Sequence, residues 1–240
     1  ISAILYPNSN LTIEQCRKVA EAMQPRDRDA LLQEYLGRRQ NRREKPGRAL
    51  ENTSYLFDFL ADYGMFRDLH RHRMLTQERQ TLTTDYGYVT PEELVEAGLT
   101  DPYDGAMEGA RAAYKEIHSE FPLESQYVIP LAYRIRWYMR MNLREVFHMC
   151  ELRTSVQGHK NYRRLVQRTF KLVESVHPRL AKQMRFVDMQ DYELERLDAE
   201  RRLDRKIEQL RQRDAPAKPA EKKIEPATTA QPMVTKVISQ

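Results

Sequence analysis

The sequence has few cysteines and no long apolar run. Its two cysteines, Cys16 and Cys150, show no metal-type spacing and are too few for a disulfide framework. Such sparse cysteine usage suits a reducing compartment. No run approaches the 18 apolar residues of a membrane span, and no signal peptide is visible, although a fragment could have lost one. We therefore expect a cytoplasmic protein with no membrane partner.

Neither sign of charge dominates. Lys and Arg number 40 against 35 Asp and Glu, which gives a net charge of +5. A mixed surface supports nucleic-acid binding only weakly and suits small anionic ligands equally well. The basic run 38–45 lacks interleaved aromatic residues, so we expect a solvated loop, with a phosphate-binding rim as the alternative. A basic nucleic-acid-binding protein is kept as a minor alternative.

The hydrophobic patterns predict strands and helices in mixed order. Alternation predicts strands over 2–6, 53–62 and 133–141. Helical periodicity and helix-start signals predict helices over 12–23, 27–39, 64–73, 90–98, 101–120, 142–153 and 161–176, with a short helix after Pro178. A polar loop is expected over 76–88.

Three segments carry helix-start signals. Thr12 is followed three residues later by Gln15, the spacing of a capping box. The run from Thr90 to Glu93 offers a cap, a proline at the first helical position and an acid at the box position. Asn142 and Glu145 repeat this spacing before the helix that should reach Arg153.

The Arg71-His72-Arg73 triplet places three cationic or titratable side chains in a row. Consecutive helical residues point in different directions, because each step turns about 100°. Such a triplet at a helix end suits an anion or an electron-rich ring. The alternative is a solvated basic helix end, which the helix dipole favours in any case.

The triplet, together with Asn142–Glu145, His148 and Arg153, resembles the signature of the flavin-dependent thymidylate synthase family. That signature continues from Arg-His-Arg through seven residues to a serine, and Thr81 stands at this position. Further segments agree in order and spacing: Leu50-Glu51, Phe57, Phe59, Ile129-Pro130 and 158–163. The resemblance covers roughly residues 1–188.

The resemblance implies an α+β fold, with helices packed around a mainly antiparallel sheet. It implies reductive methylation of dUMP to dTMP, with methylenetetrahydrofolate as carbon donor and FAD reduced by NADPH. It also implies a homotetramer whose sites are built from several subunits. Arginine and histidine donors suit this chemistry, because reduced flavin and phosphates are anionic.

The resemblance also assigns roles to single residues. It makes Arg153 the catalytic contact to the uracil ring and gives Arg71 and Thr81 to the substrate. Arg79 is not a family residue, and we expect it at the substrate as a replacement, by position, for a lost arginine. The cofactor contacts it implies are Arg71, His72, Arg73, Asn142, Arg144 and His148. We expect that the chain binds no metal ion.

Several positions depart from the family pattern on the dUMP side. They are Asp68, Glu78-Arg79, Thr81, Thr83 and Gln126. Charge-assisted hydrogen bonds contribute about 1.5–3 kcal/mol each, so losing arginines there would weaken substrate binding. These changes, with a first residue that is not methionine, suggest the later copy of a tandem protein, a catalytically degenerate FAD-binding partner domain. This reading is the alternative to an active synthase.

The C-terminal part differs in composition. Residues 189–213 are highly charged with a thin apolar seam, and we expect an exposed helical extension. Residues 214–240 are rich in Ala, Pro, Lys and Glu, and we expect a disordered tail.

Overall fold

The computed structural model describes residues 1–192 and Arg205. The architecture below lies within the unit Ile1–Arg196. Apart from 189–192 and Arg205, the predicted charged extension and tail lie outside the described residues, so these domain boundaries stay predictions. No helix among the described residues is both long and apolar enough to cross a bilayer.

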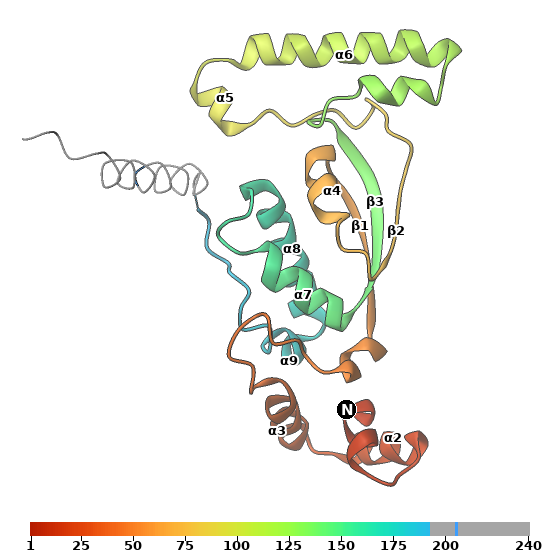
Figure 1. Ribbon diagram of the computed structural model, residues 1–240, viewed down its shortest axis with the longest axis vertical. Helices are drawn as coiled ribbons and strands as arrows, with labels where there is room; N and C mark the ends of the chain where they lie inside the picture. The colour runs from red at the N-terminus through yellow and green to blue at the C-terminus, as the bar shows by residue number, and fades with distance from the viewer. Residues whose placement is uncertain (193–204, 206–240) are drawn as a thin grey trace, which may run out of the picture. The chain divides into compact units, whose positions relative to one another are not determined.

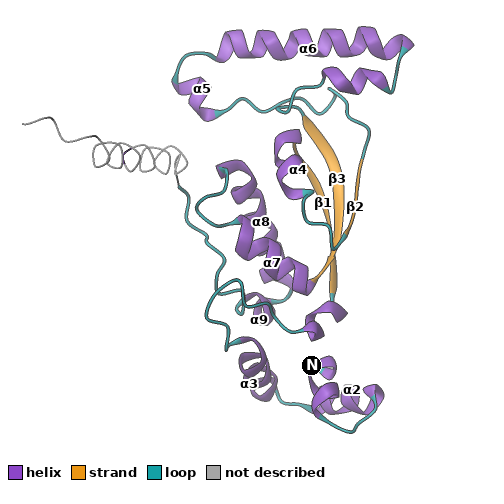
Figure 2. Ribbon diagram, in the orientation of Figure 1, coloured by secondary structure: helices purple, strands orange, loops and turns teal. Residues whose placement is uncertain are grey.

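Helices make up most of the described chain, with three strands among them (Figure 2). The α-helices are α1 (Ser2–Leu5), α2 (Ile13–Ala22), α3 (Pro25–Leu36), α4 (Tyr63–Leu69), α5 (Glu92–Glu96), α6 (Thr100–Glu120), α7 (Leu143–Arg153), α8 (Lys160–Val176) and α9 (Pro178–Ala181). The 3-10 helices are η1 (Tyr6–Asn8), η2 (Arg48–Asn52) and η3 (Glu124–Val128). The strands are β1 (Ser54–Asp62), β2 (Thr76–Arg79) and β3 (Arg134–Asn142).

The three strands form one antiparallel sheet in the order β1-β3-β2. Phe57 lies opposite Met139 and Phe59 opposite Trp137, and all four side chains are buried. Their neighbours along the strands point to the other face, because side chains alternate along a strand. The alternation over 53–62 and 133–141 therefore predicts β1 and β3 together with their buried face. The predicted α+β fold with an antiparallel sheet is confirmed.

Helices α4, α7 and α8 lie on one side of the sheet (Figure 1). Helix α7 contributes Val146, Phe147 and Met149 to the core, all of them fully buried. Burying an apolar side chain of this size contributes about 1.5–3 kcal/mol, so the packing of α7 into the core is a large part of the stabilisation. This packing also fixes the exposed side of α7, which carries residues of the candidate site.

Two predicted elements are wrong. The segment predicted as a strand over 2–6 forms α1 and then η1, and Ile4 packs into the interior. A short apolar run does not distinguish a strand from a buried helix. The loop predicted over 76–88 begins with strand β2, which pairs with β3 from Thr76 opposite Arg140. Tertiary pairing with an available strand edge decided this segment, whereas its polar composition indicated a loop.

One predicted helix start agrees with the structure and another does not. The capping box of Thr12 and Gln15 is present in both directions. Helix α5 begins after Pro91 without a side-chain cap, and the Thr90 hydroxyl donates to Asp104 instead, so the predicted Thr90 cap is wrong. A tertiary acceptor competes here with the local backbone donor.

Candidate functional site

The Arg71-His72-Arg73 triplet follows α4, which ends at Leu69, so the prediction that the helix carries the triplet at its end is wrong. The chain leaves the helix in a turn, in which the His72 N–H donates to the Leu69 carbonyl at 3.1 Å. The three side chains diverge: His72 is buried, whereas Arg71 and Arg73 are exposed. Only the histidine of the triplet therefore reaches the interior.

Both ring nitrogens of His72 are hydrogen-bonded within the chain. Nδ1 lies 2.6 Å from Oε1 of Glu145, and Nε2 lies 3.0 Å from Nε of Arg153. The arginine Nε carries a hydrogen and no lone pair, so it donates and His72 Nε2 accepts. The hydrogen-bond pattern thus assigns the ring proton to Nδ1, which donates to the Glu145 carboxylate.

Glu145 reaches His72 because of the way α7 begins. The Asn142 side-chain oxygen accepts from the Glu145 N–H at 2.9 Å, so the predicted cap is confirmed. A full capping box would return the Glu145 side chain to the Asn142 backbone. Here the carboxylate binds His72 instead, which links the start of α7 to the triplet.

A cavity of about 600 Å³ opens beside this network. It is lined by three of the predicted cofactor residues, Asn142, Arg144 and His148, and by Glu145. The basic run supplies further cations to the same cavity, namely Arg39, Arg42 and Lys45. The sequence alternative of a phosphate-binding rim therefore agrees with the placement of this run, although most of it is exposed.

One wall of the cavity rests on a buried ion pair. Arg39 donates to both carboxylate oxygens of Glu151, one of them at 3.0 Å, and its guanidinium carbon lies 5.6 Å from the ring centre of Phe147 and 5.3 Å from that of Phe186. Burial raises the pKa of Glu151, and the hydrogen bond from Arg39 opposes that shift. The expectation of a solvated loop is wrong for Arg39, because Glu151 offers it a fixed buried partner.

Arg144 is held by two acceptors. Its Nε donates to the Pro46 carbonyl at 2.9 Å, and Nη1 donates to Glu51 at 2.8 Å. Hydrogen bonds from Arg48 and from Arg144 hold the pKa of Glu51 below its usual range. The guanidinium is thus fixed at the cavity wall and keeps part of its donor fork for a ligand.

His148 stands one helical turn after Arg144, and its ring centroid lies 5.4 Å from that of His72. Desolvation lowers the pKa of His148 below its ordinary value of 6.5. The charge of Glu145 opposes the shift, and Lys45 and Arg153 add to it. His148 therefore presents a neutral imidazole to the cavity at neutral pH.

One ligand atom from each of His72, Glu145 and His148 lies within 4.8 Å of the other two. This spacing would suit a metal ion, but both nitrogens of His72 are already engaged. The Arg153 guanidinium beside them would also repel a cation. The expectation that the chain binds no metal stays a prediction.

The predicted substrate residues do not line one common cavity. Arg153 is half-buried at the end of α7, where it binds His72. Arg79 and Thr81 are exposed and line a different cavity of about 430 Å³, together with Gln126. Arg71 is exposed and forms an ion pair with Asp68 at 3.3 Å. The two cavities have no lining residue in common.

Two of the departures from the family pattern have local partners. Asp68 pairs with Arg71, and the Gln126 amide oxygen accepts from the Leu82 N–H at 3.0 Å and from Arg79 at 3.3 Å. Gln126 therefore ties the segment after β2 to η3. These substitutions are compatible with the fold, and they engage two of the arginines predicted to contact the substrate.

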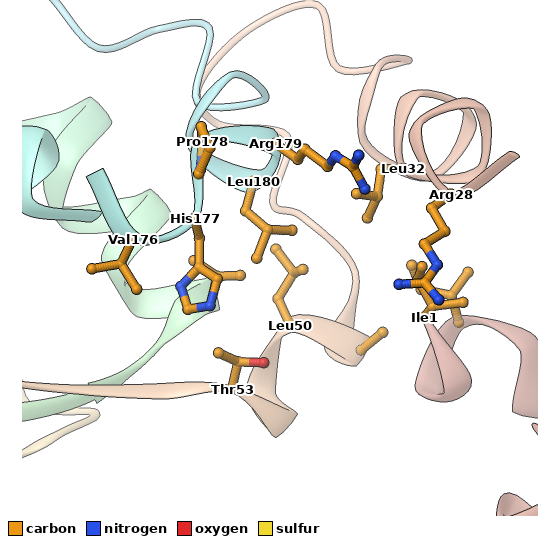
Figure 3. Close-up of a pocket in the computed structure, with 13 residues that line it drawn as sticks. Ile1, Arg28, Leu32, Leu50, Thr53, Val176, His177, Pro178, Arg179 and Leu180 are labelled. Carbon is orange, nitrogen blue, oxygen red and sulfur yellow. The ribbon is translucent and has the colours of Figure 1, made fainter. Parts of the chain in front are cut away.

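A third cavity has a volume of about 390 Å³. Figure 3 shows His177, Leu180 and Leu50 converging on it, with Arg28 and Arg179 at its edge. None of the site residues predicted from the sequence lines it. The candidate site is therefore the cavity beside α7.

Sequence reasoning missed four residues of the site. They are Arg39, Glu51, Glu145 as the partner of His72, and Glu151. Each is a charged residue with a partner far away in the sequence, and no local pattern predicts that long-range contact. An acid on the otherwise apolar side of a helix, as Glu151 is, was the one signal that could have been used.

The fold resembles that of a solved UMP/dUMP methylase, PolB from Streptomyces cacaoi, whose structure holds 5-Br dUMP. The TM-score is 0.59 and the sequence identity 13%, over 76% of this chain and 88% of that one. At this identity the likeness establishes the fold.

The family described as thymidylate synthase complementing protein matches residues 3–179. The chain belongs to this family, so the resemblance read from the triplet and α7 is confirmed. It is 41% identical to a UPF0159 protein of Chlamydia pneumoniae over 201 residues and 38% identical to one of Thermoplasma acidophilum over 182 residues. These matches cover 84% and 75% of this chain. The chain spans 38% and 36% of the length of these two relatives.

Proposed function

We propose that this chain takes part in the FAD-dependent methylation of dUMP at uracil C5, with methylenetetrahydrofolate as carbon donor and NADPH as reductant. The observation that carries the proposal is Arg153. By the family resemblance this arginine would contact uracil, and His72, which binds its Nε, also binds Glu145 of the cavity wall. The UMP/dUMP methylase with the same fold supports dUMP as the substrate.

The residues of the cavity beside α7 fit an anionic dinucleotide cofactor. A volume of about 600 Å³ lies within the range of cofactor sites. Arg42 and Lys45 have no ion-pair partner among the described residues, so both are available for phosphate oxygens. Arg144 and His148 would face the flavin ring. When bound, reduced FAD would supply the hydride that completes the methyl group.

Arg153 would act on the substrate. A fixed guanidinium beside N3 and the adjacent carbonyls of uracil stabilises negative charge on the ring. That charge increases the electron density at C5, the atom that attacks the one-carbon unit. The role requires a guanidinium with free terminal nitrogens, because a planar donor fork matches the edge of the uracil ring.

One observation favours the alternative of a substrate-deficient, FAD-binding partner domain. Arg79 and Thr81 line a cavity apart from that of the cofactor residues, and Arg71 is paired with Asp68. In an assembly whose sites are shared, a second copy or a tandem domain would bring complementary residues to each cavity. Under this alternative the chain binds FAD but does not methylate dUMP by itself.

Tritium release from [5-³H]dUMP tests the proposal, because methylation at C5 displaces the hydrogen of that carbon. We expect release that requires FAD, NADPH and methylenetetrahydrofolate together, and that falls at least a hundredfold in Arg153→Ala. The matched control is Arg168→Ala, an exposed arginine outside the cavity beside α7. FAD binding without tritium release would support the partner-domain alternative, and release that is unchanged in Arg153→Ala would contradict the role of this arginine.

A further inference from the structure

Arg153 is held on one side only. Its Nε donates to His72 at 3.0 Å, and its guanidinium carbon lies 5.8 Å from the centre of the Tyr162 ring. Neither terminal nitrogen has a hydrogen-bond partner among the described residues, although the side chain is half-buried. The planar end of the guanidinium is therefore free to bind a ligand, while its Nε side is anchored.

The anchor depends on the tautomer of His72. A neutral imidazole accepts at Nε2 only when its proton is on Nδ1. The Glu145 carboxylate, 2.6 Å from Nδ1, can only accept, so it retains the proton at that position. Without the carboxylate, the proton could move to Nε2, where it would face the Nε–H of Arg153. Two donors would then point at each other.

We infer that Glu145 and His72 are positioning residues, which orient the Arg153 guanidinium for its ligand through the chain Glu145–His72–Arg153. The inference deepens the proposed function and rests on it for the identity of the ligand. It changes the role given to His72, which acts on Arg153 rather than on the cofactor. Asn142 supports this series of contacts, because its cap fixes the first turn of α7 from which Glu145 projects.

Burial makes the chain of contacts strong. The His72 side chain is 3% exposed and that of Glu145 13% exposed. Water therefore competes little for these hydrogen bonds, and the loss of one partner leaves the other without a substitute. The groups that face the His72 ring are Glu145, Arg153 and His148, and His148 is the only one of them that does not hydrogen-bond to it.

The first test is ¹⁵N NMR of the histidine ring in the unliganded protein, with His72 assigned by comparison with His72→Gln. We expect a protonated Nδ1 and an unprotonated Nε2 in the wild type and in Glu145→Gln, whose amide oxygen can still accept. In Glu145→Ala we expect the Nδ1 preference to be lost. A wild-type His72 protonated on Nε2 would overturn the inference, whatever the protein binds.

The second test is dUMP affinity in matched pairs of variants, with unfolding curves to confirm that each folds. His72→Gln places an amide oxygen near the position of Nε2 and should retain most of the affinity, whereas His72→Ala should lose about tenfold. The same contrast is expected between Glu145→Gln and Glu145→Ala. Equal losses within each pair would contradict positioning and indicate a structural role.

The two tests separate this inference from the proposed function. If the wild type binds no dUMP but the NMR result holds, Glu145 and His72 still orient Arg153, and its ligand is a planar hydrogen-bond acceptor other than dUMP. If dUMP binds and Arg153→Ala abolishes binding, but the ring proton of His72 is on Nε2, the function stands and the positioning chain is wrong.

Discussion

The cavity beside α7 and the cavity beside β2 both contain residues predicted from the sequence, but they are built differently. The first is supported by hydrogen bonds between distant segments, such as His72 to Glu145 and Arg39 to Glu151. Most residues that line the second are exposed, and among the described residues Arg79 hydrogen-bonds there to Gln126 and to the carbonyl of Gln80. The first is a preorganised site, whereas the second resembles a surface that a neighbouring domain could complete.

The largest expected effect concerns the support of the first cavity. Arg39→Ala would leave the buried Glu151 carboxylate without its partner, which costs about 3–5 kcal/mol of folding stability. Arg38→Ala is the matched control, because Arg38 pairs with Glu34 on the surface, where such pairs contribute about 0–1 kcal/mol. Urea unfolding curves of the two variants measure the contrast. Similar losses in both variants would mean that the buried pair does not support the cavity.

We expect a smaller effect from removing two cations that line the same cavity. The double change of Arg42 and Lys45 to alanine removes two cations placed for phosphate, and we expect at least a tenfold loss of FAD affinity. Arg43→Ala serves as control, since Arg43 is an exposed neighbour that does not line the cavity. Fluorescence titration with FAD measures both variants. Equal affinity in the double variant and the control would place the phosphates elsewhere.

The contrast between the cavities also shows what the sequence could predict. Asn142 was recognised as a cap and β3 as a half-buried strand, because both depend on neighbours within a few residues. The Arg-His-Arg triplet and the segment from Asn142 to Arg153 gave the family. Local sequence patterns therefore predicted the elements that frame the first cavity and the residues that identify the family.

The remaining features depend on contacts across the chain. Nothing near Glu145 indicates that its carboxylate turns away from the helix start toward His72, which stands 73 positions earlier. Thr76 and its neighbours became a strand because β3 offered a free edge. The interior position of Arg39 depends on Glu151, 112 positions later. Only the three-dimensional structure shows that Arg79 and Thr81 line a different cavity from Arg144 and His148.

The measurement that tests the central claim most directly is a titration of the FAD-loaded protein with dUMP, followed by the flavin absorbance spectrum. The account predicts a saturable spectral change that is lost in Arg153→Ala and retained in Arg168→Ala, because Arg153 would hold uracil against the flavin. A flavin spectrum that does not respond to dUMP at any concentration would contradict methylation by this chain. The cavity beside α7 would then be the cofactor-holding half of a shared site.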